Sequence, residues 1–440
     1  MKAIVLADDL TGAADVQAHL WPRYTSLLRI LREPIRVDHV DTHGRQTDTI
    51  VLDTEARFLS ADIARRVITR GLNLAMRKLW SRDPRPLLYL KADSTLRGHI
   101  GLQVQVAARS LDAGIVPIVL ANPREGRQTL EGHQLVHGEP VHKTALAQDP
   151  VHPISDSRIA KLFGPLDGMV VEEIPLYTVR AGVPALAAIL SRVRRRPTAL
   201  VLDALTDNDL DQIARAILLA EIPVICGSAA LTMHLDLGPS SGRELICADV
   251  QRLGCSISGP TLVVAGSLHP VTTEQVRMLS HRLGSPPTLV TVTADVDQLS
   301  RDLATSLLDH GTAILTTARA RGSGPEGIER SEMLGTLIGE VVRRADHRVR
   351  ISSLVVVGGR TSYHVCRALR MTMLEMVGAA LPEMPLLRSV APPTRVLGLK
   401  PGGFGSPETL IQTIESFRAT GKQATMPRYE KARESKAQRQ

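Results

Sequence analysis

The sequence predicts an α/β protein of two domains, each with a largely parallel sheet flanked by helices. The chain has 440 residues, more than one ordinary hydrophobic core organises, so two domains of about 200 residues each are expected. Short apolar runs alternate with longer helical patterns along both halves, which is typical of strands and helices that follow one another in α/β folds. A stretch rich in glycine and proline separates the two halves.

In the first half, apolar runs rich in Val, Ile, Leu and Ala predict strands. Such near-continuous runs are typical of parallel strands that are buried on both faces. The predicted strands are Ala3 to Ala7, Thr49 to Leu52, Leu87 to Leu90, Ile115 to Leu120, Ala199 to Leu202 and Pro223 to Cys226. Residues 1–236 are therefore predicted to form the first domain.

Residues 237–260 contain Gly238, Pro239, Gly242 and Pro260 and are predicted to be the interdomain connection. The second domain is predicted over residues 261–425. Its predicted strands are Thr261 to Ala265, Thr288 to Val292, Ala313 to Thr316 and Leu354 to Val357. From Met426 onward the apolar periodicity is lost, so residues 426–440 are predicted to be a disordered tail.

The composition favours a small anionic ligand over nucleic acid. The formal net charge is +8, but aromatic residues make up only 2% of the chain, so the stacking platforms of single-strand binders are missing. Hydrophobic residues at 43% and charged residues at 22% predict a packed globular core. A carboxylate or phosphate substrate suits the basic balance.

The cysteines and the N-terminus predict a cytoplasmic protein. Cys226, Cys247, Cys255 and Cys366 show no C-x-x-C spacing and are expected to be free thiols in a reducing compartment. The first apolar run is too short for a signal peptide, and no apolar stretch approaches the length of a membrane span.

Two adjacent carboxylates, Asp8 and Asp9, follow the first predicted strand. In open α/β sheets ligands bind where strands end, so these carboxylates are candidates for holding a substrate hydroxyl or accepting its proton. The alternative is that one of them only caps the helix that follows. The sequence favours a functional role for at least one.

A dense polar cluster follows the strand that ends at Leu90. Arg97 can bind a carboxylate through two hydrogen bonds, and Lys91 can act as a point charge. Asp93 can hold a hydroxyl or cap a helix, which leaves the choice of base among Asp8, Asp9 and Asp93 open. The cluster consists of Lys91, Asp93, Ser94, Thr95 and Arg97, and a solvated turn is the less favoured alternative.

Further along, Arg127 lies in a glycine-punctuated stretch suited to a loop over an anionic ligand. Nearby His133, His137 and His142 have no spacing that predicts a metal site, so no metal ligands are assigned.

In the second half, strand ends carry glycine turns. Glycine lets the backbone approach phosphate groups, and the N–H groups at helix starts favour negative charge. Neither a G-x-x-x-x-G-K-[ST] motif nor a G-x-G-x-x-G motif after a strand is present. Three such turns in one domain still indicate a nucleotide site. Its predicted residues are Ser267, Gly358, Gly359, Thr361, Gly402, Gly403 and Gly405.

These clusters, in this order, resemble the four-carbon acid sugar kinase family along nearly the whole chain. The strongest similarity is in three strings: Ala7-Asp8-Asp9-Leu10-Thr11-Gly12-Ala13, Asp93-Ser94-Thr95-Leu96-Arg97-Gly98, and Gly126-Arg127-Gln128-Thr129. Gly266-Ser267 to Thr272 also fits the family pattern. Two positions depart from it: Arg360 stands where an acidic residue is usual, and Gly403 where Asn is usual.

The resemblance implies an ATP-dependent kinase, with Mg²⁺, that phosphorylates a hydroxyl of threonate, erythronate or a 3-oxo-tetronate. The first domain would then bind the acid sugar and the second the nucleotide. Asp9, Asp93 and Arg97 would be catalytic, and Asp8, Lys91, Ser94, Thr95 and Arg127 would bind the substrate. The expected partners are the acid sugar and ATP, with no nucleic acid and no membrane; a homo-oligomer is compatible with the sequence.

Two alternatives remain. The departures at Arg360 and Gly403 would suit a catalytically weakened relative that binds an acid sugar or a nucleotide as a sensor. A Rossmann-type dehydrogenase is disfavoured because the glycine fingerprint and its ribose-binding acid are absent from the sequence.

Overall fold

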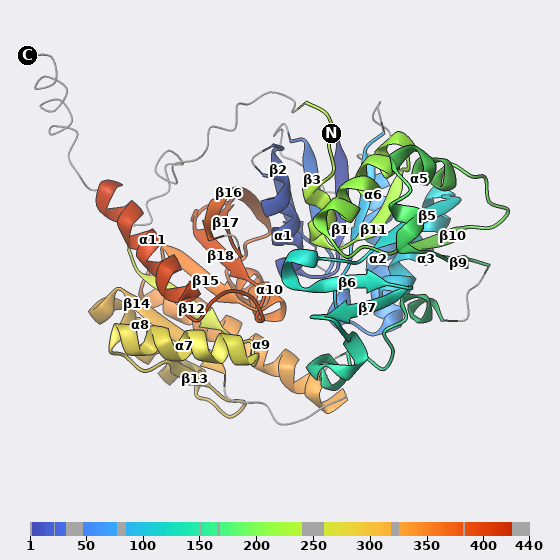
Figure 1. Ribbon diagram of the computed structural model, residues 1–440. Helices are drawn as coiled ribbons and strands as arrows, with labels where there is room; N and C mark the ends of the chain where they lie inside the picture. Colours follow the sequence, from blue (N-terminus) through green and yellow to red (C-terminus); the bar gives the residue numbers. More distant parts are fainter. Residues whose placement is uncertain are drawn as a thin grey trace, which may run out of the picture. The chain divides into compact units, whose positions relative to one another are not determined.

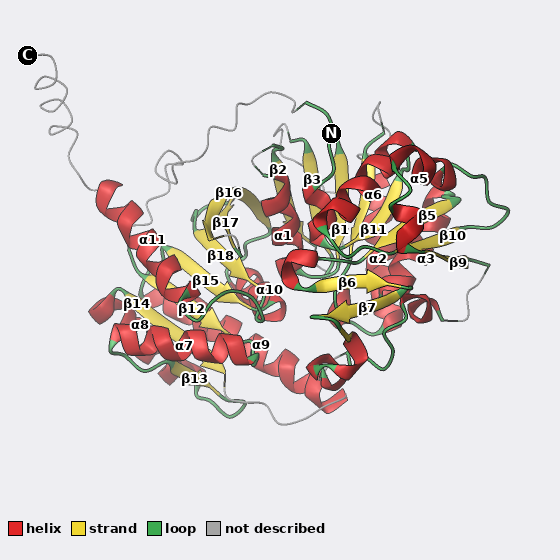
Figure 2. Ribbon diagram, viewed as in Figure 1, coloured by secondary structure: helices red, strands yellow, loops and turns green. Residues whose placement is uncertain are grey.

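The computed structural model describes residues 2–21, 23–31, 47–76, 85–149, 152–164, 168–239, 259–317, 325–381 and 383–424. The chain divides into two compact units. The first comprises Met1–Leu245, Ala320–Met333 and Met371–Met376, and the second comprises Ile246–Arg319, Leu334–Arg370 and Val377–Gln440. Each unit has a largely parallel sheet with helices packed on it, so the predicted fold class is confirmed (Figures 1 and 2). The predicted domain boundaries remain predictions, because residues 240–258 and 425–440 lie outside the described residues.

The sheet of the first unit has the strand order β2-β3-β1-β4-β11-β5-β10-β9, and these neighbours are parallel. At its β2 edge, Met373, Leu374 and Glu375 of β16 pair antiparallel with Arg29, Leu28 and Leu27. The strands are β1 (Ala3–Ala7), β2 (Ser26–Ile30), β3 (Thr49–Asp53), β4 (Leu87–Lys91), β5 (Ile115–Val119), β9 (Val170–Ile174), β10 (Thr198–Leu202), β11 (Val224–Gly227) and β16 (Met373–Leu381).

Both faces of this sheet are buried, as the near-continuous apolar runs require. Ile4 and Leu6 of β1 pack into a cluster with Ile68 of α2 and Val104 of α3, while Val5 points to the opposite face and is also buried. The helices of the unit are α1 (Leu10–Leu20), α2 (Ala61–Ala75), α3 (Ile100–Leu111), α4 (Leu176–Val179), α5 (Val183–Leu190) and α6 (Asp207–Leu219). Its 3₁₀ turns are η2 (Ala56–Phe58), η4 (Pro123–Glu125), η5 (Val141–Lys143), η6 (Ala145–Gln148), η7 (Ile159–Phe163) and η8 (Ala229–Met233).

A small antiparallel sheet of β6 (Arg127–Leu130), β7 (His133–Val136) and β8 (Glu139–Pro140) belongs to the first unit as well. Figure 1 shows β6 and β7 as a pair separate from the large sheet. The turn between them is fixed by Asp203, which accepts hydrogen bonds from the Glu131 N–H at 2.8 Å and the Gly132 N–H at 3.0 Å. Sequence analysis did not predict this hairpin, because its strands are short and mostly polar.

The second unit has the strand order β13-β14-β12-β15-β18-β17-β16. The five neighbours β13, β14, β12, β15 and β18 are parallel to one another. The next strand, β17, is antiparallel to β18. The strands are β12 (Thr261–Ala265), β13 (Thr288–Val290), β14 (Thr312–Thr317), β15 (Ser353–Val357), β17 (Met384–Ser389) and β18 (Val396–Lys400). The helices are α7 (Pro270–Leu283), α8 (Val296–His310), α9 (Pro325–Arg348), α10 (Gly359–Ala368) and α11 (Thr409–Ala424).

Cys226 and Cys366 are buried free thiols, and Cys247 and Cys255 lie outside the described residues. Among the helices that the structure describes, none is both long and apolar enough to cross a membrane.

Candidate functional site

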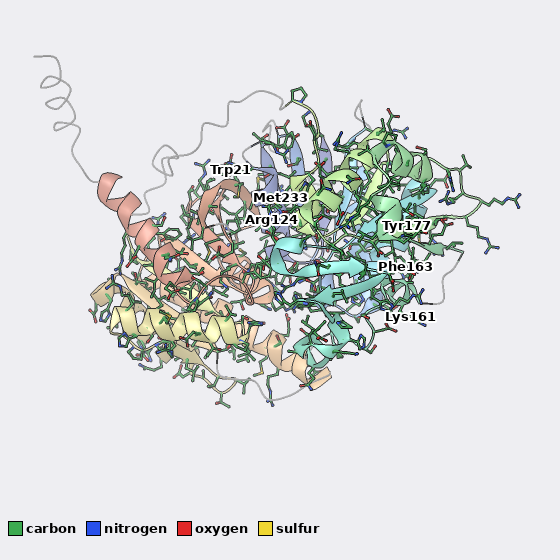
Figure 3. All side chains as sticks on the ribbon, in the orientation of Figure 1. Trp21, Arg124, Lys161, Phe163, Tyr177 and Met233 are labelled. Carbon is green, nitrogen blue, oxygen red and sulfur yellow. The ribbon has the colours of Figure 1, made fainter. Side chains whose placement is uncertain are left out.

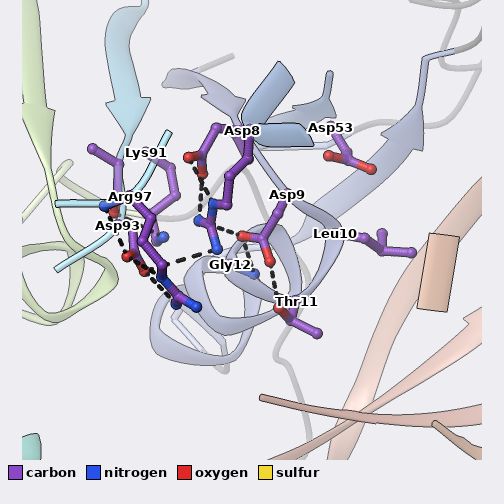
Figure 4. A network of polar contacts seen from close by, with 12 residues as sticks. Asp8, Asp9, Leu10, Thr11, Gly12, Asp53, Lys91, Asp93 and Arg97 are labelled. Carbon is purple, nitrogen blue, oxygen red and sulfur yellow. Dashed lines mark hydrogen bonds and ion pairs between the residues drawn. The ribbon is translucent and has the colours of Figure 1, made fainter. Parts of the chain in front are cut away.

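Three strands of the first unit end side by side. Ala7 of β1 pairs with Asp53 of β3 on one side and with Lys91 of β4 on the other. Because the strands are parallel, the segments that follow them leave the sheet at the same edge. This edge carries a network of buried charged side chains, shown in Figure 4.

The guanidinium of Arg57 lies at the centre of this network. Its Nε and Nη2 donate to Asp8 Oδ2 at 3.0 Å and Oδ1 at 2.7 Å. Nη2 also lies 2.8 Å from Asp9 Oδ1, and Nη1 lies 3.8 Å from Asp93 Oδ1. Sequence analysis missed Arg57, although it follows the predicted strand at residues 49–52 by only a few positions and the same strand-end argument would have included it.

Asp9 is both a helix cap and a member of the network. Its Oδ1 accepts the Gly12 N–H at 3.1 Å at the start of α1, and its Oδ2 accepts the Thr11 hydroxyl at 2.5 Å. Burial alone would raise the pKa of Asp9, but Arg57 and Lys91 outweigh burial, so the pKa lies below its ordinary value. Asp9 is therefore ionised at neutral pH.

Gly12 lets Lys91 approach this carboxylate. A Cβ at position 12 would lie 2.6 Å from Lys91 Nζ and 2.6 Å from Asp9 Oδ1, which no side chain permits. Lys91 is buried, and its Nζ donates to the Ala92 carbonyl at 2.9 Å. The structure thus places the ammonium next to Asp9.

Asp93 holds Arg97. Arg97 donates to Asp93 through Nε at 2.8 Å and through Nη2 at 3.1 Å, and the Thr95 hydroxyl donates to Asp93 Oδ2. Burial raises the pKa of Asp93, but Arg97 and Arg57 lower it more, so it lies well below its ordinary value. Leu96 within this loop has a φ of +67°, a strained conformation for a residue other than glycine.

Arg127 lies within electrostatic reach of this loop. Burial lowers its pKa, Glu125 and Asp93 oppose that, and Arg97 lowers it further. The structure therefore brings Asp8, Asp9, Lys91, Asp93, Thr95 and Arg97 together, with Arg127 close by and Ser94 in the same loop; their chemical roles remain predictions.

Asp53 stands apart from the hydrogen-bonded network in Figure 4. It is fully buried; its Oδ1 accepts the Glu55 N–H at 3.1 Å, and its Oδ2 has no partner within the described part of the chain. Burial raises the pKa of Asp53 well above its ordinary value; Glu55 opposes this through its N–H, while Asp9 and Asp8 raise the pKa further. Asp53 therefore keeps its proton to a higher pH than an exposed aspartate does.

Two further side chains that sequence analysis missed reach the network from residues 149–152. Asp149 Oδ2 lies 3.7 Å from Arg97 Nη1, and a ring nitrogen of His152 bonds to the Arg57 carbonyl. Asp149 directly follows the 3₁₀ turn η6 and not a strand, so the strand-end argument gives no signal there. By contrast, Arg124 pairs with Asp207 at 2.8 Å and contacts Met233 at the surface, outside the network (Figure 3).

In the second unit, the predicted glycine turns meet at one edge of the sheet. Ala265 pairs with Val357, and Val357 pairs with Lys400, so β12, β15 and β18 end level with one another. The turns that follow contain Ser267, Gly358, Gly359, Thr361, Gly402 and Gly403, while Gly405 lies by Thr409 and Glu383. The clustering matches the expectation, and the role in nucleotide binding remains a prediction.

These glycines allow the turns to pack on one another. A Cβ at Gly266 would overlap Thr361 Oγ1, and a Cβ at Gly402 would overlap Ser267 Oγ. At Gly403 a Cβ would lie 3.3 Å from His269 Nε2, so the imidazole occupies the space beside that position. The glycines here therefore allow two turns of the same chain to pack closely. The sequence argument considered only the approach of the backbone to phosphate.

No side chain caps the start of α10. Its cap, Gly358, has a φ of +106° and provides no side-chain hydrogen bond to the first N–H groups of the helix. Arg360 adds a positive charge, with its guanidinium 5.7 Å from the Tyr363 ring centre. The N-terminal end of a helix dipole is positive, so an anion is favoured there.

Among the described residues, no group of three or more His, Cys, Asp or Glu side chains could hold a metal ion.

The chain matches two family models. Residues 3–235 match a sugar-binding N-terminal domain, and residues 262–410 match a nucleotide-binding C-terminal domain. These matches cover the first-unit network and the second-unit glycine turns, respectively.

Curated relatives match over almost the full length. A D-threonate kinase of Salmonella typhimurium is 30% identical, covering 94% of this chain and 98% of the relative. A 3-oxo-tetronate kinase of Methylobacterium radiotolerans is 27% identical over 93% and 98%, and a D-erythronate kinase of Heliobacterium modesticaldum is 25% identical over 87% and 88%. A solved structure of a Salmonella typhimurium protein superposes with a TM-score of 0.73 at 24% identity, covering 93% and 98% of the two chains, which supports the fold alone.

Proposed function

Because this chain belongs to the four-carbon acid sugar kinase family, we propose that it transfers the γ-phosphoryl group of ATP to a hydroxyl of a four-carbon sugar acid. The chain is a small-molecule kinase, as its curated relatives are. The observation that carries the proposed substrate is the buried network of carboxylates and cations in the domain that matches a sugar-binding model. A sugar acid needs both kinds of group: acceptors for its hydroxyls and cations for its carboxylate.

We assign the carboxylate of the substrate to Arg97 and Arg127, with Lys91 contributing charge. Arg97 is the more exposed partner of its pair with Asp93, at 32% against 11% for the side chains, so part of the Arg97 side chain is accessible. Asp93 fixes the direction of that guanidinium through two hydrogen bonds. Ser94, Thr95 and Asp8 complete the proposed acid site.

Asp9 is proposed to orient the hydroxyl that attacks. The low pKa of Asp9 makes it a weak proton acceptor at neutral pH, but a good hydrogen-bond acceptor. Phosphoryl transfer passes through a loose transition state in which positioning and charge stabilisation matter more than early proton removal. An ionised Asp9 is suited to this task.

ATP, as its magnesium complex, is proposed to bind at the glycine turns of the second unit. The uncapped N-terminus of α10 and Arg360 would receive phosphate oxygens, with Ser267 and Thr361 as hydroxyl donors beside them. Gly402, Gly403 and Gly405 would shape the turn that borders the site. This assignment is supported by the match to a nucleotide-binding domain.

The test is ADP release from MgATP in a coupled assay, with D-threonate, D-erythronate and a 3-oxo-tetronate supplied separately. We expect one of these acids to stimulate ADP release and the others to do so far less. If none does, the proposed function is wrong. If an acid or ADP then raises the melting temperature without any turnover, the sensor hypothesis replaces the kinase proposal. Arg360 and Gly403 are the residues that motivate this hypothesis.

A further inference from the structure

Two cations of the proposed acid site are carried by different segments. Arg97 belongs to the loop that follows β4, and Arg127 opens β6 of the small hairpin. The two charges act on each other, since Arg97 adds to the effect of burial in lowering the pKa of Arg127. Two guanidinium groups on separate segments bind one carboxylate well only if their spacing is fixed.

A single buried amide connects these segments. Gln134 of β7 is fully buried, and its Nε2 donates to the Ser94 carbonyl at 2.8 Å and to the Leu120 carbonyl at 3.4 Å. Its Oε1 accepts the hydroxyl of Thr129, its cross-strand partner, at 2.8 Å. The amide therefore has a defined orientation, with the donor toward the loop that carries Arg97 and the acceptor toward the strand that carries Arg127.

The loop needs such support because its backbone is strained. Leu96, two residues after Ser94, has a φ of +67° and is 2% exposed. A residue with a Cβ is strained in this conformation, so the surroundings must hold it. The hydrogen bond from Gln134 reaches the Ser94 carbonyl, two residues before this strained position.

We propose that Gln134 is a positioning residue of the acid site: it ties the hairpin that carries Arg127 to the loop that carries Asp93 and Arg97, and so sets the spacing of the two cations. Gln134 does not touch the substrate. The kinetic part of this inference rests on the proposed function; the structural part does not.

Gln134→Met removes the donor and the acceptor while keeping the length of the side chain. We expect a rise of about tenfold or more in the KM for the acid that wild type uses, with the KM for ATP unchanged. The matched control is Gln128→Met on the same hairpin, because Gln128 also donates to a backbone carbonyl, that of Leu205 at 3.0 Å, but away from the loop. The control should leave both KM values unchanged.

A double-mutant cycle separates positioning from general damage. If Gln134 acts through the placement of Arg127, then Gln134→Met should cost much less acid affinity in an Arg127→Ala background than in wild type. Equal costs in the two backgrounds would contradict the inference. If Gln134→Met does not fold, Gln134→Leu takes its place, since it also removes the donor and the acceptor and adds no charge.

Amide hydrogen exchange in the ligand-free protein provides a readout that needs no enzymatic activity. We expect peptides spanning residues 93–99 to exchange faster in the Gln134 variant than in wild type and in the Gln128 control. Faster exchange without any acid-dependent ADP release would show that the proposed function is wrong while the positioning role holds. Unchanged exchange in these peptides together with an unchanged KM for the acid would overturn the inference.

Discussion

Arg57 and Asp8 form a two-point ion pair in the interior of the first unit, with Nε–Oδ2 and Nη2–Oδ1 distances of 3.0 Å and 2.7 Å. The two side chains are 6% and 5% exposed, so solvent screens the pair only weakly. The same guanidinium also contacts Asp9. Removal of this one side chain would leave several carboxylates buried close together without their common cation.

Arg57→Met should therefore lower the free energy of unfolding by about 3–5 kcal/mol, as expected when one partner of a buried ion pair is lost. It should also raise the pKa of Asp9, because Arg57 is the strongest influence that lowers it. Urea unfolding at neutral pH measures the first effect. Arg124→Met is the control: Arg124 is 60% exposed in its pair with Asp207, and the loss should stay below about 1 kcal/mol. Similar losses in both variants would contradict the central role of Arg57.

Asp53→Asn should change the pH dependence of stability. Because the folded-state pKa of Asp53 is raised, the folded protein binds more protons than the unfolded chain at pH values between the two pKa values, and stability falls as pH rises through this window from about pH 4. Asparagine is neutral at every pH, so the variant should lack this part of the decline. The stability of the variant relative to wild type should therefore be higher at pH 8 than at pH 4. Unfolding free energies at several pH values test this. The control is Asp309→Asn, because Asp309 is exposed on α8 and its variant should retain the wild-type pH dependence of stability. If stability in Asp53→Asn falls with pH as steeply as in wild type, Asp53 is ionised in the folded protein.

Gly266→Ala should weaken nucleotide binding. The added methyl group would overlap the Thr361 hydroxyl, and relief of that overlap displaces the start of α10, where phosphate is proposed to bind. We expect an increase of at least about tenfold in the Kd for a non-hydrolysable ATP analogue, measured by calorimetry. Gly114→Ala is the control, because a Cβ there meets nothing within 4 Å. An unchanged Kd in Gly266→Ala would remove this turn from the nucleotide site.

His364 should contribute to acid lability of the second unit. Burial, together with the positive charges of Arg360 and Arg367, lowers the pKa of His364 to about 3. The folded state therefore binds fewer protons than the unfolded chain between about pH 3 and 6.5, so stability is complete above pH 6.5 and is lost as pH falls through this window. His364→Gln should abolish a loss of about 3 kcal/mol between pH 7 and pH 4. The control, His310→Gln at an exposed position, should leave this loss unchanged. If His364→Gln loses as much unfolding free energy between pH 7 and pH 4 as wild type does, His364 is not the source of the loss.

Several strands with unbroken apolar runs could be predicted from the sequence, but burial on both faces alone did not reveal a strand, because β2 and β18 are buried along their whole length and were not predicted. The run from Ala3 to Ala7 coincides with β1, and Thr261 to Ala265 coincides with β12, because parallel strands covered on both faces are apolar throughout. The segment Ser26–Ile30 carries Arg29 and was not predicted as β2. The hairpin strands of β6 and β7 were missed for the same reason, since their residues are mostly polar.

For the candidate site, the argument from strand ends identified the right segments of the chain but not every side chain that takes part. Asp8, Asp9 and Asp93 follow strands directly, and the structure places them within one network. Arg57 and Gln134 were not selected, because an arginine in a short turn and a glutamine in a polar hairpin look like surface residues in a sequence. Their burial follows only from long-range packing, which one-dimensional patterns do not contain.

The pairing of β2 with Met373, Leu374 and Glu375 has a consequence for biosynthesis. The ribosome synthesises β1 to β11 well before it reaches this segment. The edge of β2 therefore lacks its β16 partner while more than a hundred further residues are translated. Exposed strand edges pair readily with other chains. The nascent first unit is therefore most vulnerable to aggregation in that interval, and a fragment cut at the end of the first sequence half would carry the same open edge permanently.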